Sequence, residues 1–374
     1  MLTLKSEDDE NEKDEFIISQ ERPVFFAVDN FPFEIAYLDN GSLKLSCLEK
    51  VSKFYTKNNL MLSGNMNRVK PIDLLKFINL DAELLIIKNK RKILGSILSI
   101  LFPIAVQTDL KITDIVAKND RYRNLIPCLS SVNNILFANT TFLNNHKKYR
   151  GKGLGMVLIQ KSLQIAYEQG ILCAYFLNTT ARCANAVTIK NWVYPVNPDN
   201  LDKLHIDYPR KYRSCYTITL PENQKIIRVE KENMLEALQL YLKLVKDKKF
   251  YLNPDIQYWK KWIENHKTYM VQMDNKFIGI FSINKILTYI PTKKCEIEHG
   301  SVLICVGQQP ETVRSLIYTC KEQNFDLLML EEVGDLNSRL LSKIWAINTQ
   351  TKDYLNFYNT RISLQPSEIY SPLL

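Results

Sequence analysis

Apolar and polar positions along the chain predict strands and helices in a repeated order. Residues 34–58 predict a strand followed by an amphipathic helix. Helical spacing of apolar residues over 154–169 predicts another helix, and Gly170 follows it at a C′ position. Apolar, partly β-branched runs predict strands at 84–87, 93–101, 135–143 and 171–177. The last two strands and the helix between them are expected to form a β-α-β unit.

The second part of the chain repeats this order. We expect a strand and a helix within residues 226–246 and two strands around the turn Asp274-Asn275. A further strand at 302–306, a helix at 312–323 and a strand at 326–330 follow. The pattern predicts an α+β fold of two tandem halves, each a mixed, mostly antiparallel sheet flanked by helices. We place the halves at residues 21–208 and 209–374, after a disordered acidic tail at 1–20.

Length and hydropathy favour a globular protein. The chain has 374 residues, 46% of them hydrophobic, which is enough for two domains with a sizeable core. The longest apolar run, residues 93–106, is too short to span a bilayer, and we expect a buried strand that ends at Phe102 and Pro103. No signal peptide or transmembrane segment is predicted, so we expect a cytoplasmic monomer.

Charge and cysteine usage narrow the ligand class. The net charge of +9 suits a polyanionic ligand, while no nucleic-acid-binding motif is present. The eight cysteines contain no C-x-x-C pair, and the four histidines have no metal-ligand spacing. We therefore expect reduced thiols, no metal site and no permanently bound cofactor.

The segment between the predicted strand 135–143 and the helix after it reads R-G-K-G-L-G. Its residues are Arg150, Gly151, Lys152, Gly153, Leu154 and Gly155. A glycine turn lets main-chain N–H groups approach a phosphate, and the helix dipole favours negative charge there. The alternative is that the glycines only form a turn before the helix and that the nearby lysines only form a solvent-exposed face. The pattern R-x-x-G-x-G resembles the pyrophosphate loop of GNAT-type acyl-CoA transferases, and the strand, helix and basic cluster around it all favour coenzyme A.

A longer stretch resembles a more specific family. Residues 142–152, F-L-N-N-H-K-K-Y-R-G-K, are similar to F-L-C-x-H-K-K-L-R-S-K of the eukaryotic glycylpeptide N-myristoyltransferases. The similarity continues without gaps to Asn197-Pro198 and, more weakly, covers most of the chain. The resemblance implies two GNAT-like halves, with the first binding the co-substrate myristoyl-CoA. It further implies transfer of the myristoyl group to the N-terminal glycine amine of peptides or proteins.

The resemblance also assigns roles to residues. Main-chain N–H groups of Phe142 and Leu143 would form an oxyanion hole, and the C-terminal carboxylate of Leu374 would be the base. Coenzyme A would contact Phe142, Leu143, Asn144 and the turn from Arg150 to Gly155. Thr141 and Leu177 stand where the family has the Asn and Thr that line the amine site. The chain ends in S-P-L-L, an apolar sequence that suits a terminus inside the protein.

The peptide side departs from the family pattern. Leu177 cannot accept a hydrogen bond from an amine, and the family's C-terminal K-F-G-x-G-D-G loop falls on W-A-I-N-T-Q-T, residues 345–351. A glycine-rich loop lets the backbone come close to a peptide. Two alternatives therefore stay open: a catalytically inactive acyl-CoA-binding protein derived from this family, and a GNAT N-acetyltransferase that acts on a small amine.

Overall fold

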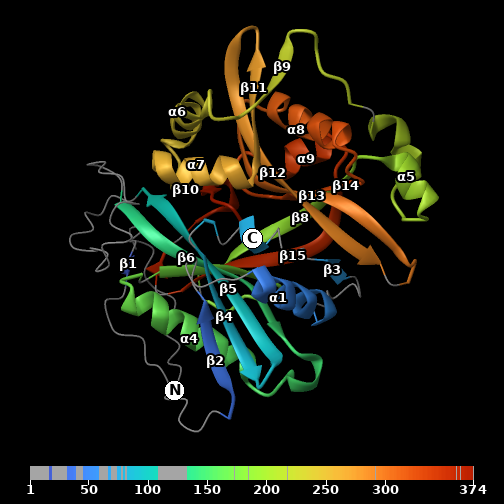
Figure 1. The fold of residues 1–374 in the computed structure, drawn as a ribbon. Coiled ribbons are helices and arrows are strands. Elements are labelled where there is room, and N and C mark those ends of the chain that lie inside the picture. Colours follow the sequence, from blue (N-terminus) through green and yellow to red (C-terminus); the bar gives the residue numbers. More distant parts are fainter. Residues whose placement is uncertain are drawn as a thin grey trace, which may run out of the picture.

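The computed structural model of the chain (Figure 1) describes residues 17–18, 32–38, 45–58, 66–68, 74–76, 79–80, 82–107, 133–171, 173–183, 185–216, 218–290, 292–358, 360–362 and 364–373. Most of the predicted tail, residues 1–20, lies outside these ranges, as does Leu374. Within the tail, the short strand β1 (Ile17–Ile18) pairs with β16 (Thr360–Arg361).

One mixed sheet of fifteen strands runs through the described molecule. Its strands are β2 (Glu34–Leu38), β3 (Met66–Arg68), β4 (Ala82–Asn89), β5 (Lys92–Val106), β6 (Asn133–Asn145), β7 (Cys173–Asn178), β8 (Val187–Pro195), β9 (Gln224–Arg228), β10 (Phe250–Leu252), β11 (Lys267–Met273), β12 (Lys276–Ile290), β13 (Cys295–Gly307), β14 (Leu327–Glu331), β15 (Ile347–Tyr358) and β17 (Ile369–Tyr370). The main path is β17-β10-β5-β6-β7-β15-β8-β14-β13-β12-β11-β9. β4 pairs with β5 and with β2, and β3 pairs with β12.

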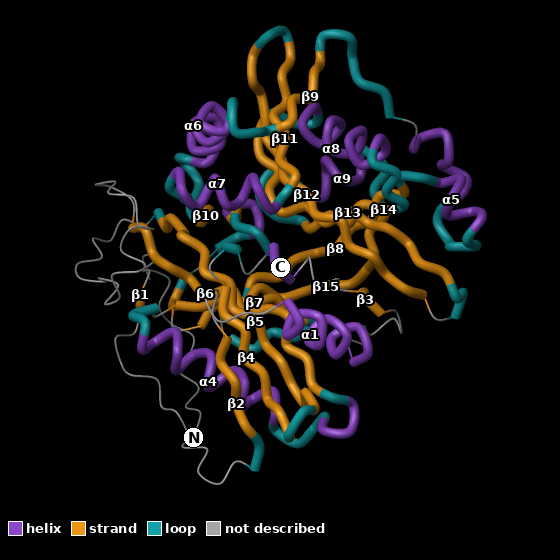
Figure 2. The backbone as a smooth tube through the Cα atoms, viewed as in Figure 1, coloured by secondary structure: helices purple, strands orange, loops and turns teal. Residues whose placement is uncertain are grey.

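The helices lie outside this sheet (Figure 2). They are α1 (Leu45–Asn58), α4 (Leu154–Glu168), α5 (Pro198–Lys203), α6 (Met234–Val245), α7 (Ile256–Asn265), α8 (Glu311–Glu322) and α9 (Ser338–Lys343). The described ranges also contain the 3-10 helices η1 (Lys147–Tyr149), η2 (Arg210–Tyr216) and η3 (Pro366–Glu368). No helix in the described ranges combines the length and hydropathy that a bilayer crossing requires.

The predicted β-α-β unit is present. β6 and β7 are parallel and are connected through α4. Gly170 ends the helix in the left-handed conformation (φ 82°), because a glycine has no Cβ that would clash there. The same arrangement occurs again, since β13 and β14 are parallel and α8 connects them.

The sheet order shows how the two repeats join. In one repeat β5, β6 and β7 are neighbours, and in the other β12, β13 and β14 are neighbours. Between them lie β8 and β15, which pair with each other, but β15 is next to β7 and β8 is next to β14. The last strand of the first repeat, β8, therefore lies against the second repeat, and the last strand of the second repeat, β15, lies against the first. The α+β fold class expected from the sequence is confirmed.

Each repeat has helices on both faces of its strands. Leu85 and Ile97 pack with Leu158 of α4, while their sequence neighbours Leu84 and Leu98 pack in the main core with Leu48 of α1. Alternate residues of a strand point to opposite faces, so α1 and α4 cover opposite sides of the β4–β5 pair. In the second repeat α6 shares the main core with Ile280 and Ile304, and α8 packs on the other side with Phe281 and Ile283.

The expected end of the apolar strand at Pro103 is wrong, because β5 continues to Val106. Pro103 pairs with Leu136 of β6 on one side. On the other side of β5, pairing with β4 ends at Ile100 and pairing with β10 starts at Ile104. Proline lacks the N–H that a strand ladder uses. Here it lies between two neighbouring strands, where no ladder bond needs that donor.

Candidate active site

β6 and β7 pair over a short distance and then diverge. Their parallel register includes Phe137 with Cys173 and Asn139 with Tyr175, and it ends there. β6 continues to Asn145 beside β5, whereas β7 continues beside β15. Beyond Asn139 the edge of β6 that faced β7 has no strand partner in the described chain, so its main-chain groups can bind a ligand.

An irregularity of β6 falls on the two residues expected to form an oxyanion hole. Thr141 pairs with Leu98 and Asn144 with Ser96, so Phe142 and Leu143 together oppose Ile97. This is a β-bulge, which interrupts the ladder and re-aims main-chain groups. The Leu143 side chain is 43% exposed, unusually high for leucine in a strand. The bulge therefore lies at an accessible part of the strand edge.

The glycine turn follows β6 directly. Gly151 and Gly153 have φ values of 75° and 78°, and a Cβ at either position would meet no atom within 4 Å. Gly153 is the N-cap of α4 and supplies no side-chain cap. The first N–H groups of a helix have no intrahelical acceptor. They are therefore left available at an exposed helix N-terminus, where the helix dipole favours an anion.

The bulge and the turn lie against each other. A Cβ added to Gly155 would be 3.0 Å from Asn145 Nδ2 and 3.8 Å from Leu143 Cδ2. Leu154 and Asn144 also lie here, but both are buried. The Asn144 amide donates to the Tyr55 carbonyl at 3.3 Å, so this side chain has a structural partner. The predicted coenzyme A residues are thus neighbours, although Leu154 and Asn144 offer only their main chain to a ligand.

The surroundings of the turn are positively charged. Lys147, Lys148 and Lys152 are exposed, and none forms an ion pair with the acidic groups that the structure describes. Burial lowers the pKa of His146, and the charges of Lys92, Lys148 and Lys57 lower it further. The positive potential that lowers this pKa disfavours a further positive charge on His146, and the same potential attracts a negatively charged phosphate.

The end of α1 holds the turn in place. Asn58, its last residue, is 3% exposed. Its side-chain oxygen accepts from the Lys147 N–H at 3.3 Å, and its carbonyl accepts from the Arg150 guanidinium. Arg150 is therefore engaged with the protein on at least one side, and its role in the turn is at least partly structural.

The C-terminal segment lies beside the point where β6 and β7 diverge. The Tyr175 hydroxyl is 2.9 Å from Ser371 Oγ and 3.2 Å from the Pro372 carbonyl oxygen. Leu373 is 4% exposed and belongs to the main core. The expectation that the chain enters the protein near its end thus holds for residues 371–373, while Leu374 lies outside the described residues. Tyr175 was missed by the sequence analysis because its apolar neighbours identify it as a core residue.

Thr141 and Leu177, the predicted amine-site residues, are both partly buried. Thr141 lies on β6 immediately before the bulge, and Leu177 lies on β7 opposite Leu355 of β15. They therefore belong to strands on the two sides of the divergence. Leu177 also packs against the main core. The structure places both residues around the same region but provides no hydrogen-bonding group from Leu177.

The loop at residues 345–351, which aligns with the glycine-rich segment of the resembled family, contains no glycine but still has residues in the left-handed backbone conformation. Trp345 (φ 64°) and Gln350 (φ 59°) occupy that region. The Gln350 N–H donates to Asn348 Oδ1 at 2.7 Å, and the Thr349 hydroxyl donates to the Asn191 carbonyl at 2.9 Å. Local side-chain hydrogen bonds of this kind stabilise turns that glycine would otherwise permit.

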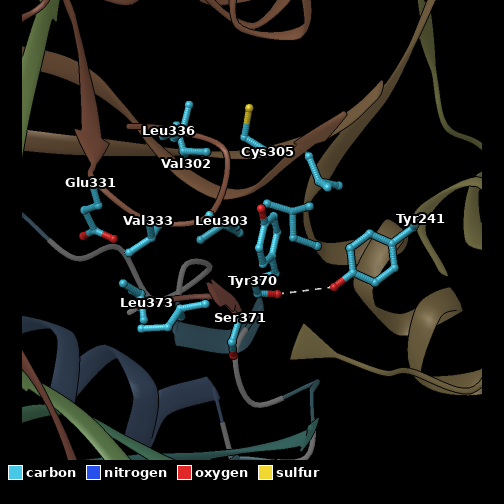
Figure 3. Close-up of a pocket in the computed structure, with 14 residues that line it drawn as sticks. Tyr241, Val302, Leu303, Cys305, Glu331, Val333, Leu336, Tyr370, Ser371 and Leu373 are labelled. Atoms are coloured by element: carbon cyan, nitrogen blue, oxygen red, sulfur yellow. Dashed lines mark hydrogen bonds between the residues drawn. The ribbon is translucent and has the colours of Figure 1, made fainter. Parts of the chain in front are cut away.

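A narrow cavity of about 30 Å³ lies where β13 and β14 diverge in the other repeat (Figure 3). Its lining includes Leu303, Glu331, Tyr370, Ser371 and Leu373. Burial, and to a smaller extent the nearby charge of Asp353, raises the pKa of Glu331 to about 8. The C-terminal segment therefore contacts both repeats, through this cavity in the second and through Tyr175 in the first.

The raised pKa of Glu331 predicts a pH-dependent stability. Its proton is bound more tightly in the folded than in the unfolded chain, so stability is lost as pH rises from about 4.5 to about 8. Glu331→Gln is therefore expected to raise the free energy of unfolding by about 2–4 kcal/mol at pH 8 and to change it little at pH 5. Denaturant unfolding at both pH values measures this.

The adjacent Glu332 is the matched control. Burial alone would raise its pKa, but a hydrogen bond from Ser338 and the Lys190 charge together lower it. Glu332→Gln should therefore destabilise the protein at pH 8. Equal effects of the two substitutions would contradict the assignment of Glu331 as a carboxyl that is neutral in the folded protein.

Among the residues that the structure describes, no cluster of three or more His, Cys, Asp or Glu side chains could hold a metal ion. The candidate site offers main-chain donors at the helix N-terminus and exposed lysines around them. Such donors stabilise anions, including a diphosphate and the oxyanion of a tetrahedral intermediate.

Comparisons with known proteins identified structures with a similar fold but no protein with a similar sequence. No family model and no curated protein matches the sequence. Among solved structures, N-myristoyltransferase of Saccharomyces cerevisiae with bound myristoyl-CoA has a TM-score of 0.70 and 16% identity over 93% of this chain and 86% of the yeast chain. Another structure of the yeast enzyme, with myristoyl-CoA and inhibitors, has a TM-score of 0.72 and 14% identity over 97% of this chain and 92% of the yeast chain. The chain therefore has the N-myristoyltransferase fold, and the resemblance seen in its sequence is confirmed at that level.

Proposed function

We propose that this protein is an N-acyltransferase that moves a myristoyl group from myristoyl-CoA to the N-terminal glycine amine of a peptide or protein. The observation that carries the proposal is the contact between the bulged edge of β6 and the uncapped glycine turn of α4. The yeast structures with this fold bind myristoyl-CoA. Acyl-CoA is thus the co-substrate that both the geometry and the fold favour.

In this proposal the turn binds the donor. The N–H groups at Gly153, Leu154 and Gly155 would take the diphosphate of coenzyme A, and Lys148 and Lys152 would balance its charge. The acyl thioester would then extend along the free edge of β6 toward Phe142 and Leu143. Their N–H groups would bind the carbonyl oxygen as it gains negative charge.

The acceptor amine would attack from the side of the C-terminal segment. An N-terminal ammonium has a reference pKa of about 7.7–8.0 and must lose a proton before it attacks. We assign that proton to the carboxylate of Leu374, with Thr141 beside the amine. The amine nitrogen bonds to the thioester carbon, the C–S bond breaks, and coenzyme A leaves as a thiolate that takes up a proton.

Transfer of label from myristoyl-CoA to Gly-initiated peptides tests the proposal. We expect amide-linked product with a free N-terminal glycine and none with the same peptide acetylated at its N-terminus. An excess of acetyl-CoA should not prevent the reaction, which distinguishes myristoyl transfer from acetyl transfer. Absence of product across a broad library of Gly peptides would refute the proposed activity.

A second candidate function is acyl-CoA binding without catalysis. The apolar Leu177 and the glycine-free loop at residues 345–351 favour it, because neither provides what the family pattern offers to a peptide. Calorimetry distinguishes the two candidates. Tight binding of myristoyl-CoA together with no turnover on any Gly peptide would establish the binding protein.

The proposed oxyanion hole predicts that the main chain of Leu143 matters more than its side chain. Leu143→Pro removes the N–H and is expected to lower kcat by roughly 100-fold or more, the usual effect of losing one such donor. Leu143→Ala keeps the N–H and removes an exposed side chain, so kcat should stay within about 3-fold. Single-turnover kinetics with saturating myristoyl-CoA measures both. Equal losses in the two variants would argue against a main-chain role.

A further inference from the structure

A buried amide lies where β6 and β7 diverge. Asn139 is 1% exposed, and its side-chain oxygen Oδ1 has no hydrogen-bond partner. Buried acceptors almost always have a partner in native proteins, so one without a partner requires an explanation. Asn139 is paired with Tyr175 in the last register position that β6 and β7 share. The unsatisfied oxygen therefore belongs to the residue of β6 at which the two strands begin to diverge.

Hydrogen bonds to Tyr175 fix the direction in which this amide points. The Tyr175 hydroxyl donates to the Pro372 carbonyl oxygen at 3.2 Å. Burial raises the pKa of Tyr175, and hydrogen bonds from Ser371 and Asn139 oppose that rise, as donors to a phenol oxygen do. Oδ1 is the side-chain atom of Asn139 that lacks a partner, so we assign the contact with Tyr175 to the NH₂ group, the donor of the amide. The C-terminal segment determines this orientation through Tyr175.

The position of Asn139 suits a group that reacts at the bulge. Asn139 and Thr141 lie on the same face of β6, because side chains of a strand alternate. Three residues of strand separate Asn139 from Phe142, roughly 10 Å. An amine that is hydrogen-bonded to Oδ1 and attacks a carbonyl held by the Phe142 and Leu143 N–H groups spans about this distance.

We propose that Asn139 Oδ1 accepts a hydrogen bond from the reacting primary amine of the acceptor, a contact that Leu177 cannot make. This inference rests on the proposed acyl transfer. A neutral amide oxygen binds the amine in both its protonated and its free form, so it orients the nitrogen and leaves the proton to a carboxylate. Tyr175 acts as a positioning residue, because it holds the amide with its oxygen toward the amine.

Three variants test the inference in the full-length protein. Asn139→Leu removes the acceptor at similar volume and leaves no buried polar atom without a partner. It is expected to lower kcat/KM for a Gly peptide by roughly 30-fold or more while the Kd for myristoyl-CoA stays within about 2-fold. Tyr175→Phe should lower kcat/KM by roughly 5–10-fold, because the amide can then rotate.

Tyr258→Phe is the matched control, since Tyr258 is also fully buried and donates to a main-chain carbonyl, that of Leu101, at 3.2 Å. It should leave kcat/KM unchanged. An Asn139→Leu enzyme with unaltered kcat/KM for the peptide, or with an equal loss of myristoyl-CoA affinity, would overturn the role of Asn139 and leave the proposed transfer standing. No transfer by the unmodified protein would overturn both.

Discussion

Replacing Gly153 by valine is expected to lower the affinity for myristoyl-CoA by roughly 100-fold, the largest effect on donor binding that a single substitution should produce here. Gly153 has φ 78°, where a β-branched residue is strained, so the turn must change its path. At least two charge-assisted hydrogen bonds to the diphosphate would then be lost, at about 1.5–3 kcal/mol each. Isothermal titration calorimetry with myristoyl-CoA measures the change.

Gly170→Val separates this effect from simple backbone strain. Gly170 lies at the other end of α4 with nearly the same φ, 82°, and its N–H already donates to Tyr167. The two substitutions should cost similar folding stability, but Gly170→Val should leave the Kd for myristoyl-CoA nearly unchanged. If a correctly folded Gly153→Val protein bound the donor as tightly as the Gly170→Val protein, the turn would not be the diphosphate site.

Deleting Leu374 is expected to lower kcat by roughly 100-fold to 10,000-fold without weakening the binding of myristoyl-CoA. The reason is that removal of a general base in reach of the amine costs a factor of this size. The three residues before Leu374 are buried, and Tyr175 forms hydrogen bonds with two of them, Ser371 and Pro372. Their backbone is therefore expected to stay in place when the last residue is absent. Steady-state kinetics with a Gly peptide measures the loss.

Leu374→Ala provides the control, because it shortens the side chain and keeps the terminal carboxylate. Its kcat should stay within about 5-fold of that of the unmodified protein, because only part of one apolar side chain is removed. A deletion variant that is as active as Leu374→Ala would show that the proton is taken by another group, and the Leu374 assignment would have to be abandoned.

Local sequence signals predicted the elements around the candidate site well. The turn Asp274-Asn275 has positive φ at both residues, as a two-residue hairpin needs, and β11 and β12 flank it. The helix predicted from residue 154 begins there, and Gly170 ends it in left-handed backbone, as expected from its C′ position. These features depend on a few neighbouring residues, so the sequence around them is sufficient.

Features that depend on distant residues were not predictable in the same way. β13 begins at Cys295, seven residues before its predicted start at 302, because the polar Glu296 and Glu298 obscure the pattern of a strand paired with β12. The hydrogen bond between Tyr175 and Ser371 joins residues 196 positions apart. No local pattern indicates such a contact, which is why the roles proposed for Tyr175 and Asn139 arise only from the structure.

The crossed positions of β8 and β15 have a consequence for attempts to divide this protein. A fragment that ends after β8 would lack β15, the strand beside β7, and its β8 would have lost β14. Both strands would present unsatisfied N–H and C=O groups and apolar side chains to water. Such a fragment should aggregate through these open edges, because a second copy of it also lacks β14 and β15. Co-expression of the two fragments, rather than either alone, is the route to a reconstituted protein.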